Sequence, residues 1–249
     1  MGKNKSNILK FALSETVKAI ADYKMIENGD RIAVGLSGGK DSSSLLYILA
    51  YYQKYYPYDF EIVPIHVTMG FDDMDITPLK EFCDSLGLPL HVQQGDIGKI
   101  VFDIRQEKNP CSLCANLRRG ALNSAAVELN CNKVALAHHL DDCIETFFMS
   151  LIYTAQIGTF SPRTFLNRTG LTVVRPFVYL HERDVIRLAN KYEIPIIHNP
   201  CPADKKTKRE EAKALVDELS KRFNHRLRDD FITALKNFDA NKLWPKVMR

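Results

Sequence analysis

The chain has 249 residues, of which 45% are hydrophobic and 26% are charged, and its net charge is +4. A chain of this length can bury a full hydrophobic core and suits one domain with appendages. No run approaches the roughly 18 apolar residues of a membrane span, and the mild positive charge permits a nucleic-acid partner without requiring one. The first residues lead into a patterned helix and lack a cleavage site, so we expect a cytoplasmic protein with no signal peptide and no membrane partner.

The first half of the chain predicts alternating helices and strands. In order we expect a helix over 6–25, a strand over 32–36, a turn and a second helix, a strand over 60–67, a helix over 76–86, a strand over 88–92 and a polar functional excursion over 93–110. The tyrosine-rich stretch 51–58 is either a nucleotide-stacking surface or aromatic packing near a helix end.

The second half continues the alternation and ends in charged helices. We expect a helix from 111 to 129, a strand over 133–137, a helix with its apolar stripe in the core, a mobile loop over 156–170, a strand over 171–176, a helix over 185–192 and a short strand over 195–197. Between 203 and 228 there are nine Lys or Arg and five Asp or Glu, which a solvated helix face and a tRNA contact explain equally well.

The expected organisation is α/β, with a doubly wound, mostly parallel, Rossmann-like sheet. We divide the chain into an N-terminal helical extension (1–28), a catalytic domain (29–202) and a C-terminal helical extension (203–249). In such a sheet the ligand lies at the carboxyl ends of the strands. Residues just after each strand are therefore the candidates for binding.

The turn after the first strand has the composition of a phosphate site. Its residues are Ser37, Gly38, Gly39, Lys40, Asp41 and Ser42. The glycines let backbone N–H groups converge, and the N-terminus of the next helix adds partial positive charge. The serines can donate hydroxyls and the lysine can neutralise phosphate charge. A turn used for geometry alone is the alternative, and the spacing is not that of the Walker motif.

Three cysteines are the second candidate site. Cys111 and Cys114 form a Cys-x-x-Cys pair at the start of a helix, and Cys201 follows much later between two prolines. The helix dipole and the nearby Arg118 should favour thiolate at Cys114. Such a set can bind zinc, hold an iron–sulfur cluster or exchange disulfides, and the residues alone leave these three open.

The strand over 133–137 delivers the run His138-His139-Leu140-Asp141-Asp142 to the ligand edge. An aspartate in this position can take part in catalysis. The alternative is that Asp142 and Glu145 form a capping box for the helix that follows.

These motifs occur together, in the same order, in one family. The phosphate turn, the run from Cys111 to Gly120, the run from Ala137 to Asp142, Val174-Arg175-Pro176 and Pro195-Ile196-Ile197 before a cysteine resemble the tRNA 2-thiocytidine synthetase group of PP-loop ATP pyrophosphatases. The likeness extends from about Ile32 to Cys201. The chain departs from the family pattern at Ala137 and in the residues before Cys201, which leaves another tRNA nucleoside open as the target.

The resemblance implies an ATP-dependent tRNA sulfurtransferase with an adenine nucleotide alpha-hydrolase-like fold. It would adenylate the 2-oxygen of a tRNA pyrimidine, cytidine 32 in the family, and replace it with sulfur delivered through a [4Fe-4S] cluster. It further implies Mg²⁺, a homodimer and a cysteine desulfurase or other sulfur donor. The alternatives are a PP-loop ligase or amidotransferase that adenylates without transferring sulfur, and a nucleotide-binding redox sensor that uses Cys111 and Cys114.

The resemblance also assigns roles to matching residues. Cys111, Cys114 and Cys201 would bind the cluster, and Arg118 with Asp141 or Asp142 would act at the reacting centre. The residues implied to contact the nucleotide are Ser37, Gly38, Gly39, Lys40, Asp41, Ser42, His66, Val67, Thr68, Ala137, His138 and Arg175.

Overall fold

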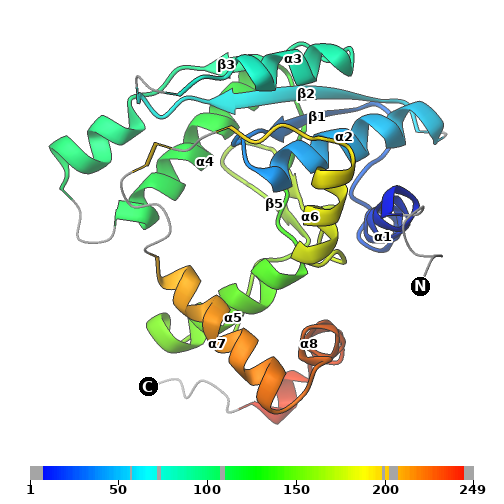
Figure 1. The fold of residues 1–249 in the computed structure, drawn as a ribbon, viewed down its shortest axis with the longest axis vertical. Coiled ribbons are helices and arrows are strands. Elements are labelled where there is room, and N and C mark those ends of the chain that lie inside the picture. Colours follow the sequence, from blue (N-terminus) through cyan, green and yellow to red (C-terminus); the bar gives the residue numbers. More distant parts are fainter. Residues whose placement is uncertain are drawn as a thin grey trace. The chain divides into compact units, whose positions relative to one another are not determined.

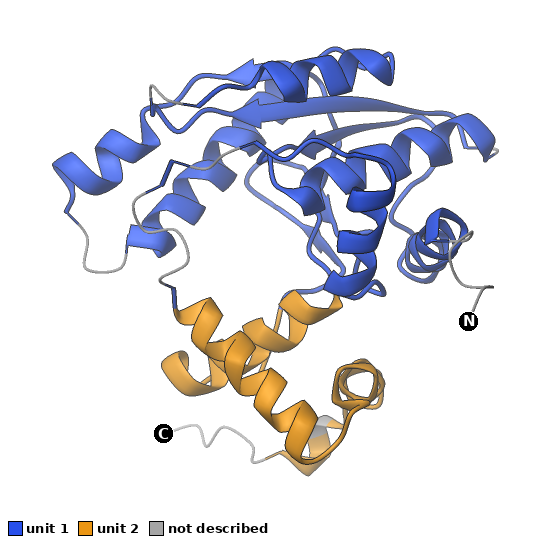
Figure 2. Ribbon diagram, in the orientation of Figure 1, with its two compact units in different colours: residues 1–139, 160–207 blue, residues 140–159, 208–249 orange. Residues whose placement is uncertain are grey.

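A computed structural model of the chain describes residues 8–56, 58–71, 74–106, 110–197, 200–201 and 207–243. The chain forms two compact units, residues 1–139 with 160–207, and residues 140–159 with 208–249 (Figure 2). The boundaries expected at residues 28 and 202 stay predictions.

The first unit contains a six-stranded sheet with the order β3-β2-β1-β4-β6-β5 (Figure 1). The strands are β1 (Asp30–Gly35), β2 (Phe60–Val67), β3 (His91–Gln93), β4 (Lys133–Ala135), β5 (Arg163–Phe165) and β6 (Thr172–Val174). All pairs are parallel except β5 with β6. The expected doubly wound, mostly parallel sheet is therefore confirmed.

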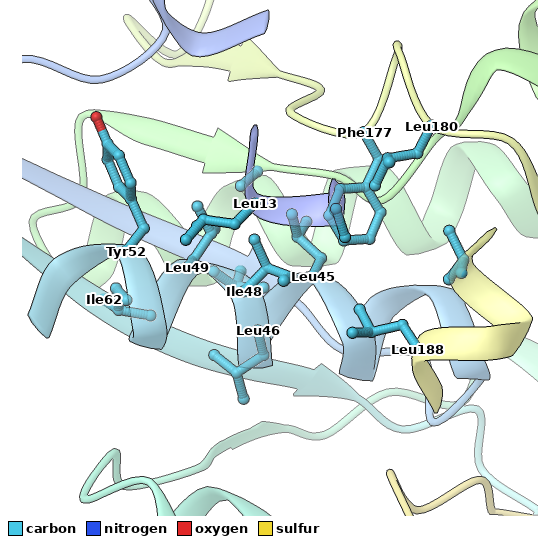
Figure 3. Packing of buried hydrophobic residues seen from close by; sticks show 14 of the residues in the cluster. Leu13, Leu45, Leu46, Ile48, Leu49, Tyr52, Ile62, Phe177, Leu180 and Leu188 are labelled. Atoms are coloured by element: carbon cyan, nitrogen blue, oxygen red, sulfur yellow. The ribbon is translucent and has the colours of Figure 1, made fainter. Parts of the chain in front are cut away.

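Helices cover both faces of this sheet. They are α1 (Ile8–Asp22), α2 (Lys40–Tyr55), α3 (Thr77–Ser85), α4 (Pro110–Glu128) and α6 (Glu182–Lys191). Side chains alternate along β1, so Ile32 and Val34 pack in the cluster with α1, α2 and α6, whereas Ala33 packs with α4. Figure 3 shows the first cluster, where Leu13 of α1, Leu45 and Leu49 of α2, Leu188 of α6 and Phe177 gather.

The tyrosine-rich stretch at the end of α2 belongs to the packing. Tyr52 is buried, and its ring lies 4.6 Å from that of Tyr56 and 5.9 Å from that of Phe60, between centroids. This favours aromatic packing over a nucleotide-stacking surface.

The second unit consists of helices α5 (Leu140–Thr154), α7 (Lys208–Arg222) and α8 (Leu227–Lys236) and a 3-10 turn, Ala240–Lys242. Ile144 of α5 and Val216 of α7 are buried. The apolar stripe of α5 is buried only near its start, since Leu151 and Ile152 are exposed. The prediction that the whole stripe is core was wrong.

Two other expectations, the loop over 156–170 and the strand over 195–197, were wrong in detail. Residues 156–170 include β5, because residues 163–165 pair with β6, so this stretch is not simply a loop. The polar excursion contains a π-helix (Lys99–Ile104) whose Val101 is buried against Met69 and Ile97. Residues 195–197 belong to no strand. The Ile197 N–H donates a hydrogen bond to Gly38 of the phosphate turn rather than to the sheet.

No helix within the described residues is both long enough and apolar enough to cross a membrane.

Candidate functional site

The phosphate turn lies where the order of the strands reverses. The chain runs from β1 outward to β2 and β3 on one side, and returns to place β4 on the other side of β1. The loops that leave β1 and β4 therefore diverge, and ligands of open α/β sheets bind in the crevice between such loops. The turn at 37–42 follows β1, and His138 and His139 follow β4.

Gly38 gives this turn its shape. Its φ is +83°, a conformation that side chains with a Cβ disfavour. Its carbonyl accepts a hydrogen bond of 2.9 Å from the Ile197 N–H, and a Cβ added at Gly38 would lie only 2.1 Å from Ile197 Cγ1. The segment before Cys201 is thus packed directly on the phosphate turn.

The two serines close the turn with their hydroxyls. Ser37 Oγ lies 3.1 Å from Ser42 Oγ, which also accepts a 3.1 Å hydrogen bond from the Ser37 N–H. Gly39 is the N-cap of α2, and no described side chain caps this helix end. Backbone N–H groups at a helix start, together with hydroxyls, form an anion site.

Lys40 is held between two carboxylates. Its Nζ donates to Asp41 Oδ2 at 3.1 Å and to Glu182 Oε1 of α6 at 3.0 Å. Burial lowers the pKa of Lys40, but the two carboxylates outweigh it and the net pKa is raised. Asp41 Oδ1 is buried, has no hydrogen-bond partner among the described residues and lies 3.9 Å from His139 Nε2. A carboxylate oxygen without a hydrogen bond is a suitable ligand for Mg²⁺.

His66, near the end of β2, contacts the residue that precedes the turn. Its Nδ1 lies 2.8 Å from the carbonyl oxygen of Leu36, and the residue is buried. Burial lowers the pKa of His66 in spite of this bond, and the charge of Arg118 lowers it further. A neutral ring donates Nδ1–H to Leu36, so His66 is a structural support for the strand end.

The residues after His66 are engaged with the chain itself. The Thr68 N–H donates to the Gln93 carbonyl at 2.9 Å, and the Thr68 hydroxyl accepts from the Gly95 N–H at 2.9 Å. Val67 pairs with Gln93 in the β2–β3 ladder. Their expected contacts with adenine stay predictions.

An aromatic ring and a cation lie together among the residues that follow β4 and β6. The His138 ring lies 5.0 Å from the ring of Phe160, and the Arg175 guanidinium lies over the same ring at 5.0 Å. Arg175 also donates to the Ser161 carbonyl at 2.6 Å. Ala137 is partly buried against the main core. His138 and Arg175, which are distant in sequence, are thus brought together on Phe160.

The three cysteines are neighbours in the first unit. The pKa of the Cys114 thiol is raised by burial, and the thiols of Cys201 and Cys111 raise it further, whereas the Arg118 guanidinium opposes them. The expectation that Cys114 favours thiolate was therefore wrong, because Cys114 lies in the second turn of α4 and is partly buried. A metal that binds Cys114 would have to displace the proton of its thiol.

Three cysteine thiols form this donor set. Among the described residues, no three His, Cys, Asp or Glu side chains are arranged to hold one metal ion. In a four-iron cluster each cysteine binds a different iron, so three thiols leave one iron without a protein ligand. The chemistry of these three thiols fits an iron–sulfur cluster.

Asp141 and Asp142 lie in the second unit, in the first turn of α5. Asp141 is buried and its Oδ1 lies 2.5 Å from Arg228 Nε of α8, whereas Asp142 Oδ1 accepts from Arg209 of α7 at 2.6 Å. The helix begins at Leu140, so Asp142 is not its N-cap and the capping-box alternative was wrong. Arginines from the C-terminal helices hold both aspartates.

Glu145 completes this cluster. It is buried, and Arg209 donates to its Oε2 at 3.3 Å. Burial raises the pKa of Glu145 to about 7, with a further contribution from Asp142. The start of α5 thus carries three carboxylates, of which one titrates near neutral pH.

With this geometry described, comparison with known proteins identifies the family. The chain matches the PP-loop domain family over residues 10–219. It is 37% identical over 231 residues to a tRNA-cytidine(32) 2-sulfurtransferase of Syntrophotalea carbinolica, covering 92% of this chain and 89% of the relative. The enzyme of the same name from Alkalilimnicola ehrlichii is 38% identical over 248 residues, which cover 99% and 79% of the two chains. The chain belongs to the PP-loop family, among the tRNA-cytidine(32) 2-sulfurtransferases.

The fold agrees with this assignment. A U34-tRNA thiolase from Methanococcus maripaludis, solved with its [4Fe-4S] cluster, superposes with a TM-score of 0.75 at 24% identity. The superposition covers 94% of this PP-loop chain and 81% of the thiolase, and it shows a shared fold. The family match and the similar relatives confirm the resemblance stated from the motifs.

Sequence reasoning missed four residues around these sites. Phe160 lies in the stretch that was predicted to be a loop. Glu182 has the pattern of any acidic residue at the start of a helix. Arg209 and Arg228 are two of nine basic residues in a charged segment. No local pattern distinguishes these residues from their neighbours, because their partners are distant in the sequence.

Proposed function

We propose that this PP-loop protein is an ATP-dependent tRNA sulfurtransferase that converts cytidine 32 to 2-thiocytidine. One observation carries the proposal, namely that the phosphate turn and the three cysteines belong to one compact unit and are connected through Arg118. The charge of this arginine lowers the pKa of both Cys114 and His66. His66 is hydrogen-bonded to the carbonyl of Leu36, directly before the turn. This supports an ATP site and a site that can carry sulfur within the same unit.

ATP supplies the leaving group. The 2-oxygen of the pyrimidine attacks the α-phosphorus, the bond to the β-phosphate oxygen breaks, and pyrophosphate leaves. The α2 N–H groups, the hydroxyls of Ser37 and Ser42 and the ammonium of Lys40 stabilise the charge that develops on pyrophosphate. Asp41 would hold Mg²⁺ through Oδ1. One of Asp141 and Asp142 takes part in this step.

Sulfur then replaces the activated oxygen. A cluster held by the thiolates of Cys111, Cys114 and Cys201 supplies, when bound, an iron with an open position for sulfide. Attack at C2 and loss of AMP leave a carbon–sulfur bond in place of the carbon–oxygen bond, with no net oxidation. Arg118, beside Cys114, offers positive charge to the anionic sulfur and to the departing AMP.

We infer the partners from this chemistry and from the family resemblance. The target base is unstacked from a single-stranded anticodon loop, which costs little. A cysteine desulfurase or another persulfide carrier supplies the sulfur, and a thiol reductant supplies the two electrons that convert the sulfane sulfur of the persulfide to sulfide. The active form is a homodimer.

The test is thiolation under anaerobic conditions. The protein reconstituted with iron and sulfide is incubated with tRNA, ATP, Mg²⁺ and sulfide, and the digested nucleosides are analysed by mass spectrometry. We expect cytidine 32 to exchange oxygen for sulfur, and Cys201→Ala to abolish both the iron–sulfur absorption and the product. The control Cys131→Ala, at a buried cysteine packed with α4, should retain both.

Two results would contradict the proposal. A tRNA that gains a nitrogen-containing substituent would identify a PP-loop ligase. Full thiolation by Cys201→Ala without any cluster would show that sulfur reaches the base by another route.

A further inference from the structure

Glu182 places a second negative charge beside the phosphate turn. It is the first residue of α6, and its Oε1 lies 3.0 Å from Lys40 Nζ. Asp41 Oδ2 lies 3.1 Å from the same nitrogen. The side chains are largely covered, with exposed fractions of 26% for Lys40, 22% for Glu182 and 33% for Asp41.

The local charge of this group is negative. One ammonium faces two carboxylates, so the three side chains sum to a single negative charge at the start of α2. ATP without a metal carries several negative charges, and charges at this depth interact more strongly than they do in water. Lys40 is therefore not a ready cation for a bare triphosphate.

From this arrangement we infer that Glu182 is a specificity-determining residue, which makes the turn accept ATP as its magnesium complex and reject the metal-free nucleotide. The inference rests on the proposed ATP site. Asp41 Oδ1, buried and with no hydrogen bond from the described residues, is the acceptor a cation can share with the phosphates. The cation restores the positive charge that Glu182 cancels on Lys40.

A purely structural role for Glu182 makes a different prediction. An acidic residue at a helix N-terminus favours the helix dipole, and its bond to Lys40 joins α6 to α2. If that were its whole role, removal of its charge would lower stability and would alter the affinities for both forms of ATP by the same factor.

The experiment compares the two forms of the ligand by calorimetry, without tRNA or cluster. ATP is titrated into Glu182→Gln and the unchanged protein, once with Mg²⁺ and once with EDTA. We expect the variant to bind metal-free ATP at least tenfold more tightly and Mg·ATP within threefold of the unchanged protein. Glu182→Ser, which removes the same charge with a different side chain, should give the same shift. The control Glu81→Gln, at an exposed residue of α3, should shift neither affinity.

Equal changes for both ligands, or weaker binding of metal-free ATP, would overturn the role of Glu182. If the unchanged protein binds neither form of ATP, the proposed function itself fails, and this outcome is distinct from the first.

Discussion

At the scale of single residues, Gly38 is the most constrained position of the phosphate turn. Two independent requirements meet there, a positive φ and the close approach of Ile197. Gly29 shares the first requirement, with a φ of +81°, but a Cβ there would meet nothing within 4 Å. A comparison of Gly38 with Gly29 therefore separates the cost of backbone strain from the cost of a steric clash.

We expect Gly38→Ala to lower the free energy of unfolding by about 2 kcal/mol or more, and Gly29→Ala by about 1 kcal/mol. The first change should also weaken ATP binding, because Ile197 and the turn must move apart. Urea denaturation and calorimetry measure the two effects. Equal losses for both variants would show that the turn yields to a methyl group.

Glu145 gives the chain a pH dependence. Its pKa in the folded protein is raised from an ordinary value of 4.5 to about 7, so the folded chain keeps a proton that the unfolded chain releases. The free energy of unfolding should therefore fall as pH rises from about 4.5 to about 7. Glu145→Gln should remove this contribution and stabilise the protein at pH 8 by roughly 1–3 kcal/mol. Denaturation curves between pH 5 and pH 8 test this, and parallel curves for both proteins would contradict it.

At the scale of elements, the C-terminal helices serve as the source of cations for α5. Arg228 of α8 bridges Asp141 of α5 and Asp217 of α7, the latter at 2.6 Å. The ring of Phe231 packs edge-on against Phe147 at 5.1 Å. No residue of α8 is buried, so these contacts, more than a hydrophobic core, retain α8 in its unit.

Arg228→Gln should destabilise the second unit by about 1–3 kcal/mol, because the buried carboxylate of Asp141 loses a cation. Arg226→Gln is the matched control on the same segment, since its side chain is 78% exposed and its ion pair with Asp230 spans 3.9 Å. That change should cost less than about 0.5 kcal/mol. Thermal denaturation of both variants checks this, and similar losses would mean that the pair with Asp141 contributes little.

At the scale of the whole molecule, the positive charge is concentrated towards the C-terminus. The segment 203–228 alone has an excess of four basic residues, equal to the net charge of the chain. Arg209 and Arg228 form ion pairs with α5, which makes them less accessible to RNA. Lys221 and Arg222, in the last turn of α7, are exposed.

We expect the affinity for tRNA to fall at least tenfold between 50 and 200 mM salt, about the loss that release of counterions from a few phosphates produces. The double change Lys221→Gln with Arg222→Gln should weaken binding and flatten this salt dependence. Lys10→Gln with Lys18→Gln, on α1, removes the same charge as a control. Filter binding at several salt concentrations measures the slopes, and equal slopes for both variants would place the RNA elsewhere.

Much of the fold could be predicted from the sequence because its signals are local. Apolar runs and helical spacing indicate the alternation of β1, α2 and β2, and the glycines with serines and lysine indicate the phosphate turn. Expectations failed where pairing with a distant strand overrode weak local patterning, as for β5 at 163–165. They also failed where burial outweighed a helix dipole, as for the thiol of Cys114.

The sequence by itself determined the family and indicated the phosphate turn, because these depend on motifs of neighbouring residue types that occur in a fixed order. It predicted the three cysteines as one ligand set only through the resemblance to that family. Only the tertiary structure decided which charges surround them. Lys40 and Glu182 are 142 positions apart, and Asp142 and Arg209 are 67 apart. An ion pair depends on which side chains the fold brings within a few ångströms, and no local pattern records that distance.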